Sequence, residues 1–388
     1  MRTGTASSRP RGRGRFDALA VARELGPALA QRAAAHDAND LFVADSYADF
    51  KARKLFSAGV PAPLGGGGTA HPELCAMLQE VARCCGSSAL ALSMHTHLVA
   101  MAVWQWKHGT PAIRAAAGSL LGRVGAEELI LVSSGGSDWL EGSGRAEKVE
   151  GGFRVNARKI FASGSPSGQL LLTTAVYDDS VAGPTVLHLS VPLDGPGVRI
   201  DDNWHTMGMR ATGSNDITLE GVFVPDHAVG VRRPKGKWHE LFDVHAPVVW
   251  PLVMSVYVGV AEAARLLALG QAATRREAPI VQGLVGEMDT NLADAQLALR
   301  EMVGLANDYN FAPSLERSNK VYLCKTIVAR SALRAVELAM EICGGGSFFR
   351  NAGIERLFRD IQGVRFHPWR ERMQYVFSGR VALGLDPV

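Results

Sequence analysis

The alternation of apolar and polar residues changes twice along the chain. From residue 17 to about 122, apolar residues recur at helical spacing, with breaks at 59–61 and 65–68. Short β-type runs follow at 129–132, 147–150, 153–156, 170–176, 185–191 and 217–224. Long amphipathic stretches then return at 248–274, 280–309 and 318–342. The pattern predicts a mostly α fold with a central β-domain.

These changes divide the chain into four parts. Residues 1–16 contain five arginines among Gly, Ser and Pro without apolar periodicity, which predicts a flexible basic arm. An N-terminal helical domain is expected at 17–125, a β-domain at 126–235 and a C-terminal helical bundle at 236–388. The bundle helices carry broad apolar stripes, which favours their burial on more than one side, in part by another subunit.

Composition adds little that is specific. A net charge of +3 over 388 residues favours neither a nucleic-acid nor an acidic partner, although the basic arm alone could touch nucleic acid unspecifically. We find no run of about 18 uninterrupted apolar residues and no secretory signal, and so expect no membrane span. The five cysteines are odd in number and lack metal-ligand spacing, which favours a reducing cytoplasm and no metal site.

The first candidate chemistry lies at residues 152–164. This stretch predicts a strand, a bend and a second strand that places Phe161 and Ser163 on one face. In a flavin site the ring can pack on the isoalloxazine, and the hydroxyl or its backbone N–H can reach flavin N5. Taken alone, the same stretch also fits a surface hairpin with one phenylalanine in the core.

Further motifs occur in a fixed order and change that balance. The chain resembles the acyl-CoA dehydrogenase superfamily over roughly residues 20–385. The resemblance rests on the glycine run 65–68, Ser-Ser-Gly-Gly-Ser-Asp at 133–138, Lys-Ile-Phe-Ala-Ser at 159–163, the segment 204–214, Glu-Ile-Cys-Gly-Gly-Gly-Ser-Phe at 341–348 and Arg-Asp at 359–360. Each motif is weakly specific alone, but their ordered occurrence favours the family.

The resemblance implies an N-terminal helical domain, a small β-barrel-like domain and a C-terminal four-helix bundle, assembled as a homotetramer, a dimer of dimers. It also implies a bound flavin, FAD or FMN. The glycines of the motif at 341–348 would approach the adenine and pyrophosphate part of FAD from a neighbouring subunit, where they let backbone amides come close to phosphate. The residues it places at the cofactor are Ser133, Ser134, Ser137, Phe161, Ala162, Ser163, Arg275, Gln282, Gly344, Gly345 and Gly346.

The chain departs from the dehydrogenase pattern after the Arg-Asp motif. Dehydrogenases carry there a glutamate that removes the α-proton of an acyl thioester, whereas this chain has His367 near that point. The alternative position, near 248–250, also lacks a carboxylate. Because α-proton abstraction needs a base within hydrogen-bond reach, the sequence favours the oxygen-using branch, which resembles two-component flavin monooxygenases. In that branch a separate reductase supplies reduced flavin, which agrees with the shortened loop at 275–282.

In that branch, Ser163 would support flavin N5–H, while His97 and His367 would flank the substrate. His95 and His97 lie on different helix faces, so at most one should face the pocket, and we favour His97. Three alternatives stay open: His367 could begin the last helix with Pro368 at its first position, residues 369–372 could form a solvated helix face, and Glu371 could be a displaced base.

The sequence therefore leads to three hypotheses. The first is a flavin-dependent monooxygenase or oxidase that uses reduced flavin and O₂ on a small organic substrate. The second is an acyl-CoA or acyl-carrier-protein dehydrogenase with an unusual base. The third is a flavin-free binding or scaffold relative of the family. The sequence does not name a substrate.

Overall fold

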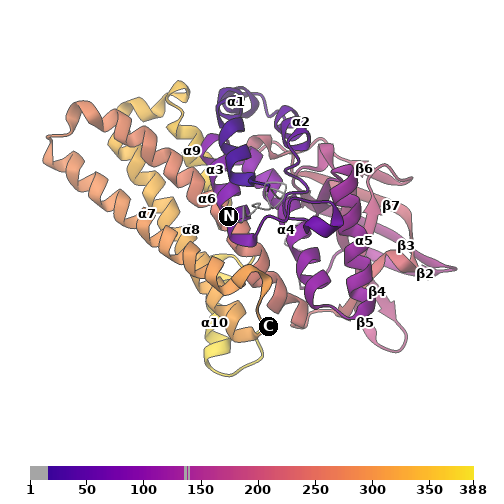
Figure 1. Cartoon of the computed structure of the whole chain (residues 1–388). Helices are drawn as coiled ribbons and strands as arrows, with labels where there is room; N and C mark the ends of the chain where they lie inside the picture. The colour runs from indigo at the N-terminus through magenta and orange to yellow at the C-terminus, as the bar shows by residue number, and fades with distance from the viewer. Residues whose placement is uncertain (1–15, 135–137, 139) are drawn as a thin grey trace, which may run out of the picture.

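The computed structural model describes residues 16–134, 138 and 140–388 (Figure 1). The basic arm expected at 1–16 falls outside this range except for Phe16, and so does Ser137. The described chain consists of a helical N-terminal part, a sheet and a second helical part, which confirms the expected fold class.

Five helices form the N-terminal part: α1 (Ala18–Ala38), α2 (Ala44–Ala52), α3 (His71–Cys84), α4 (Gly86–His108) and α5 (Pro111–Glu127). The Asp17 carboxylate caps α1 by accepting a hydrogen bond from the Ala20 amide at 2.9 Å. The predicted breaks at 59–61 and 65–68 fall between α2 and α3. Gly65 there has φ +87°, a left-handed conformation that favours glycine.

The strands form one mixed sheet: β1 (Leu131–Ser133), β2 (Arg145–Val149), β3 (Gly152–Ala162), β4 (Leu170–Asp179), β5 (Gly183–Pro192), β6 (Val198–Ile200), β7 (Asn215–Pro225) and β8 (Val229–Pro234). Their order is β6-β7-β3-β2-β4-β5-β8, with β1 parallel to β4. The predicted hairpin is β2–β3, in which Val149 pairs with Gly152. The sheet buries a core of its own that includes Phe153 and Leu187.

The C-terminal part contains α6 (Glu240–Ala272), α7 (Pro279–Ala306), α8 (Leu315–Cys343), α9 (Ile354–Ile361) and α10 (Glu371–Ala382). The long helices α7 and α8 run side by side away from the sheet, and α10 lies at the lower end of α8 (Figure 1). Helix α6 is apolar enough to cross a membrane by length and composition, but 78% of its most apolar window is buried inside the fold. It is therefore a core helix of this molecule.

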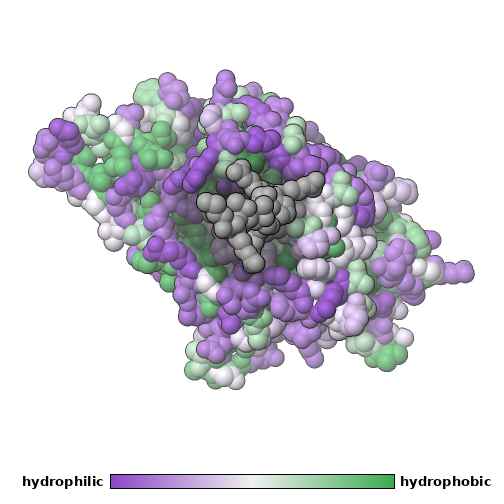
Figure 2. Space-filling view, in the orientation of Figure 1, coloured by the Kyte–Doolittle hydropathy of each residue, from purple (hydrophilic) through white to green (hydrophobic). Residues whose placement is uncertain are grey.

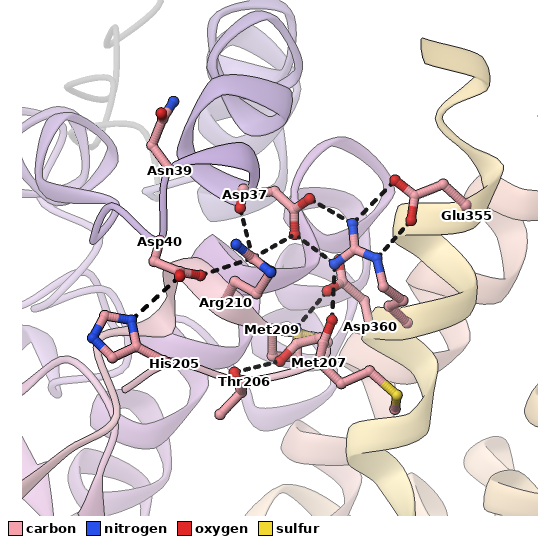
Figure 3. Close-up of polar contacts among 12 residues, drawn as sticks. Asp37, Asn39, Asp40, His205, Thr206, Met207, Met209, Arg210, Glu355 and Asp360 are labelled. Atoms are coloured by element: carbon pink, nitrogen blue, oxygen red, sulfur yellow. Dashed lines mark hydrogen bonds and ion pairs between the residues drawn. The ribbon is translucent and has the colours of Figure 1, made fainter. Parts of the chain in front are cut away.

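A polar network joins the three parts of the molecule (Figure 3). The Arg359 guanidinium of α9 contacts both carboxylate oxygens of Asp37, at 2.9 and 2.5 Å, and also pairs with Glu355. Next to it, the Met209 amide donates to the Asp360 carboxylate at 2.5 Å. The Arg-Asp motif thus fixes the C-terminal turn against α1 and against the loop that precedes β7.

Candidate functional site

An exposed aromatic surface lies where β3 ends. The Phe161 side chain is 41% exposed and its ring centroid lies 4.8 Å from that of Trp204. The Trp204 indole is fixed by a 3.0 Å hydrogen bond to the Met209 carbonyl. Ile160 and Met207 are exposed as well. An apolar and aromatic surface at the position of the expected flavin contact fits a flat ring system such as isoalloxazine.

Ser163 begins a chain of hydroxyl groups with a defined direction. Thr212 Oγ1 donates to the Met209 carbonyl at 2.9 Å and lies 2.6 Å from Ser214 Oγ, which lies 2.8 Å from Ser163 Oγ. A hydroxyl has one proton to donate, so Ser214 donates to Thr212 and Ser163 donates to Ser214. The remaining lone pairs of Ser163 can then accept a hydrogen bond, as the N5–H of a reduced flavin would offer.

The serines before β2 belong to an internal anchor. Ser134 Oγ accepts from Thr173 Oγ1 at 2.9 Å and lies 3.4 Å from the Asp138 carboxylate. Asp138 pairs at 2.8 Å with Lys159, whose side chain is fully buried. The Ser134 hydroxyl is thus engaged within the protein, while Ser133 lies half-buried on β1. Ala162, also expected near the cofactor, is buried and pairs with Asn215 in the ladder between β3 and β7.

The glycine turn after α8 lies beside Arg275. Arg275 donates to the Ile342 carbonyl at 2.5 Å, and Gly344 adopts φ +67°. A side chain at Gly345 or Gly346 would meet open space, so the backbone there is accessible to a ligand phosphate. Gln282 donates to the Arg276 carbonyl at 3.0 Å and is turned back toward the start of its own helix.

His95 and His97 have different surroundings. His95 lies 2.8 Å from the Phe56 carbonyl and accepts from the Leu131 amide at 3.0 Å, so it joins α4 to the sheet. His97 Nδ1 lies 3.2 Å from the Ser93 carbonyl and its ring faces that of His245, with centroids 6.4 Å apart. Since Nδ1 faces an acceptor, it carries the proton and Nε2 keeps its lone pair.

His367 lies against α6. Its Nε2 lies 2.6 Å from the hydroxyl of the buried Tyr257, and its ring lies 6.3 Å from that of Trp250. The Trp250 ring in turn lies 5.7 Å from the His245 ring, so Trp250 contacts both His245 and His367. The suggestion that His367 begins the last helix is wrong, because α10 begins at Glu371 with Arg370 as its N-cap.

Lys325 of α8 completes this group. Its side chain is 3% exposed, and Nζ donates to the carbonyls of His367 and Trp369 at 3.1 and 2.9 Å. Nζ also lies 5.1 Å from the centre of the Trp250 ring. Trp369 itself is buried against Phe377, so the suggestion that 369–372 forms a solvated helix face is wrong at this residue. We call His97, His245, Trp250, Tyr257, Lys325 and His367 the histidine cluster.

The histidine cluster is uncharged at its imidazoles near neutral pH. Burial lowers the pKa of His97 to about 4, against the opposing effect of its hydrogen bond to the Ser93 carbonyl, and lowers the pKa values of His245 and His367 to about 3. Burial also lowers the pKa of Lys325 to about 7. Burial is the largest cause of each of these four shifts.

Two carboxylates lie near in sequence but are engaged elsewhere. Burial raises the pKa of Asp360 to about 6, and its carboxylate accepts from the Met209 amide. Glu371 is exposed, accepts from the Tyr375 hydroxyl at 2.5 Å and lies 3.9 Å from Arg330. The arrangement therefore leaves Glu371 turned toward solvent, where it cannot act as a base at the cluster.

Gly363 brings the flavin side and the histidine cluster together. A Cβ at this glycine would lie 2.9 Å from the Tyr257 hydroxyl and 3.5 Å from the Met209 side chain. The Ser163 chain ends at the Met209 carbonyl, and the His367 pair begins at Tyr257. The two sets of residues thus approach each other across Gly363.

The structure adds residues that the sequence did not single out. His245, Trp250 and Tyr257 lie on α6 and Lys325 on α8. The spacing of seven between Trp250 and Tyr257 places both on one helix face, a signal that the sequence contains. Although three histidines gather here, no group of three metal-ligating residues within the described ranges is placed to hold a metal ion.

Comparison with known proteins agrees with this geometry. Models of the acyl-CoA dehydrogenase N-terminal, middle and C-terminal domains match residues 19–117, 133–222 and 251–367. L-evernosamine nitrososynthase of a Micromonospora species is 28% identical, over 97% of this chain and 91% of its own length. The putative acyl-CoA dehydrogenase YdbM of Bacillus subtilis is 29% identical, over 87% of this chain and 89% of its own.

A solved structure extends the comparison. KijD3, in a complex with FMN and dTDP-3-amino-2,3,6-trideoxy-4-keto-3-methyl-D-glucose, is 29% identical and superposes with a TM-score of 0.85 over 98% of this chain and 95% of its own. These relatives are enzymes, so the flavin-free scaffold considered from the sequence is set aside. Ordered motifs, a surface suited to a flavin and three matching domains give one result: the chain belongs to the acyl-CoA dehydrogenase superfamily and is a flavin-dependent oxidoreductase of that fold.

Proposed function

We propose that this protein is a monooxygenase that uses reduced flavin and O₂ to oxygenate a small organic substrate. The observation that carries the proposal is the His367–Tyr257 pair within a cluster that has no carboxylate among its members. An imidazole whose pKa is lowered to about 3 is a poor base for the α-proton of a thioester. The same neutral groups are suited to hydrogen-bonding a polar substrate.

The direction of the Ser163 chain supports a reduced cofactor. Ser163 donates to Ser214 and keeps lone pairs for an N–H donor, and a reduced flavin carries such a proton on N5. A bound reduced flavin would supply the electrons that activate O₂. The residues that would hold it are Phe161, Trp204 and Ser163 at the ring and, from a neighbouring subunit, Arg275 with Gly344 to Gly346 at the phosphate.

We propose an amine as the substrate class. L-evernosamine nitrososynthase and the amino-sugar complex of KijD3 are named for such substrates, and both relatives span nearly the whole chain. A buried site disfavours the charged form of an amine just as it does that of Lys325. An uncharged amine keeps the nitrogen lone pair that oxygenation requires.

Further properties complete the proposal. The cofactor is FMN or FAD, reduced by a separate flavin reductase. We propose a homotetramer, a dimer of dimers, supported by exposed apolar side chains of Leu266, Ile280 and Phe348. Figure 2 shows apolar patches, in green, on the part of the helical bundle that lies away from the sheet, on the left of the view. A cytoplasmic location is supported by the five cysteines, which are all free.

The alternative is dehydrogenation of an acyl thioester, favoured by the similarity to YdbM. The two reactions differ in which partner reduces the flavin. Oxidised, flavin-loaded protein is mixed without oxygen with a panel of acyl-CoA thioesters and of amines, and flavin absorbance near 450 nm is followed. We expect no bleaching by either class and full bleaching by NADH with a flavin reductase. Rapid bleaching by an acyl-CoA thioester would establish the alternative.

A further inference from the structure

A cavity of ≈ 470 Å³ adjoins the histidine cluster beyond Lys325. It lies between α8, the turn at Gln362–Phe366 and the first turn of α10. Its basic lining consists of Lys325, Arg365, Arg370 and Arg372. Its one acidic residue, Glu371, is engaged by the Tyr375 hydroxyl and lies near Arg330. We call this cavity the basic groove.

The positive charges of the basic groove are not balanced by the protein. Arg370 and Arg372 form no ion pair with any residue in the described part of the chain, and Arg365 donates only to the Gln362 side-chain oxygen at 2.9 Å. Lys325 donates only to backbone carbonyls, although its side chain is almost fully buried. The three arginines around this cavity favour an anionic ligand there.

The backbone adds to this charge. Arg370 is the N-cap of the twelve-residue helix α10, and no side chain caps its first turn. Residues 370–373 line the groove, so the positive end of the helix dipole lies at its wall. Ala329 and Leu333 form an apolar part of the lining. The groove thus combines cations and backbone amides with an apolar surface, the features that bind a phosphorylated group attached to an organic one.

We propose that the basic groove binds the diphosphate of a nucleotide-linked substrate whose reacting group lies at His367. The position of that reacting group rests on the proposed function, whereas binding of the diphosphate does not. Lys325 belongs to both the groove and the histidine cluster, so a diphosphate in the groove would lie next to the cluster. Two arginine forks match two phosphates. A nucleotide sugar and a CoA thioester both carry such a diphosphate.

The test measures binding of dTDP, dTMP, thymidine and CoA to flavin-free protein by calorimetry. It compares wild type with the Arg370→Ala/Arg372→Ala double variant. Arg123→Ala is the control, because Arg123 is an exposed arginine on α5 outside the groove. We expect dTDP to bind wild type more tightly than dTMP and thymidine. The double variant should lose at least about tenfold in dTDP affinity, and the control should lose none.

Each outcome separates the two proposals. Binding of CoA in place of dTDP, with the same loss in the double variant, would keep the diphosphate site but would contradict the amine oxygenase. Absence of binding for both dTDP and CoA, or equal dTDP affinity in the double variant and wild type, would overturn the diphosphate site while leaving the oxygenase untouched. A circular dichroism spectrum of the double variant equal to that of wild type verifies that these surface changes leave the fold intact.

Discussion

Tyr257 is the residue that holds His367 in place at the site. Its hydroxyl lies 2.6 Å from His367 Nε2; Tyr257 is fully buried and His367 is half-buried. A phenol hydroxyl can donate or accept, so this bond fixes the position of His367 Nε2 in either imidazole tautomer. The orientation of the imidazole toward a substrate therefore depends on one hydrogen bond from α6.

The Tyr257→Phe variant tests this role. Loss of one hydrogen bond should lower kcat by about three- to tenfold, with a smaller change in flavin affinity. Tyr309→Phe is the matched control, because Tyr309 is equally buried and its hydroxyl has no partner in the described part of the chain. Steady-state kinetics with a reductase measure both. Equal activity of Tyr257→Phe and wild type would show that the Tyr257 hydroxyl has no role in the reaction.

Phe161 offers a test of the flavin surface. Removing its ring in Phe161→Ala should weaken flavin binding at least about tenfold, since an aromatic contact and its buried area are lost together. Phe223→Ala serves as control, because Phe223 is exposed on the neighbouring strand β7. Fluorescence titration with FMN and FAD gives both dissociation constants. A flavin affinity that Phe161→Ala leaves unchanged would mean that the cofactor lies elsewhere.

The buried histidines predict a loss of stability in acid. Their pKa values, lowered to about 3 or 4 in the folded state, stay near 6.5 in the unfolded chain, which therefore takes up protons first. Stability should fall as the pH drops from about 6.5 to about 4.

The contribution of His245 to this loss of stability can be measured. His245→Gln removes one of these groups and should flatten the decline in Tm between pH 6.5 and 4.5, whereas His205→Gln, which changes an exposed histidine, should not. Differential scanning calorimetry at several pH values compares the three proteins. Parallel curves for His245→Gln and wild type would show that His245 takes up its proton equally in both states.

The site residues that the sequence identified and those that it missed differ in one respect. Phe161, Ser163 and His367 stand within local motifs, so their neighbours in the chain define them. His245 and Lys325 acquire their place only through the rotation of two long helices against each other, with Trp250 between them. Periodicity gives the buried face of a helix but not which of its residues meets which partner.

At the scale of elements, the Arg359 network connects α9 to α1 and to the loop before β7 (Figure 3). Arg359→Ala leaves the Asp37 and Glu355 carboxylates without this partner. Because the network is partly buried, the loss of stability should be about 2 kcal/mol, between the values for exposed and buried pairs. Urea unfolding of Arg359→Ala and of Arg123→Ala gives the comparison. A change below about 0.5 kcal/mol would show that the network contributes no more to stability than exposed ion pairs do.

Helix and strand positions were largely predictable because each element carries its own hydrophobic period. The runs at 170–176 and 217–224 lie within β4 and β7, and 318–342 lies within α8. The start of the last helix was not predictable, because Pro368 suggests a first helical position while Lys325 holds the preceding carbonyls of His367 and Trp369 in an extended turn. A contact distant in sequence overrides the local signal there.

At the scale of the whole molecule, the histidine cluster and the flavin surface come from different parts of the chain. Helices α4, α6 and α8 and the turn that ends at His367 supply the first, and the sheet with the loop at 204–214 supplies the second. The Gly363 contact joins them, so substrate and cofactor can meet only when all parts are assembled.

The most direct test of the account follows the oxygen atom. The protein, a flavin reductase, NADH and FMN are incubated under ¹⁸O₂ with dTDP-amino sugars and simpler amines, and products are analysed by mass spectrometry. The account predicts at least one product heavier by one ¹⁸O atom, absent without the protein and reduced in Tyr257→Phe. Products that carry no label, together with formation of an enoyl thioester from an acyl-CoA, would contradict it.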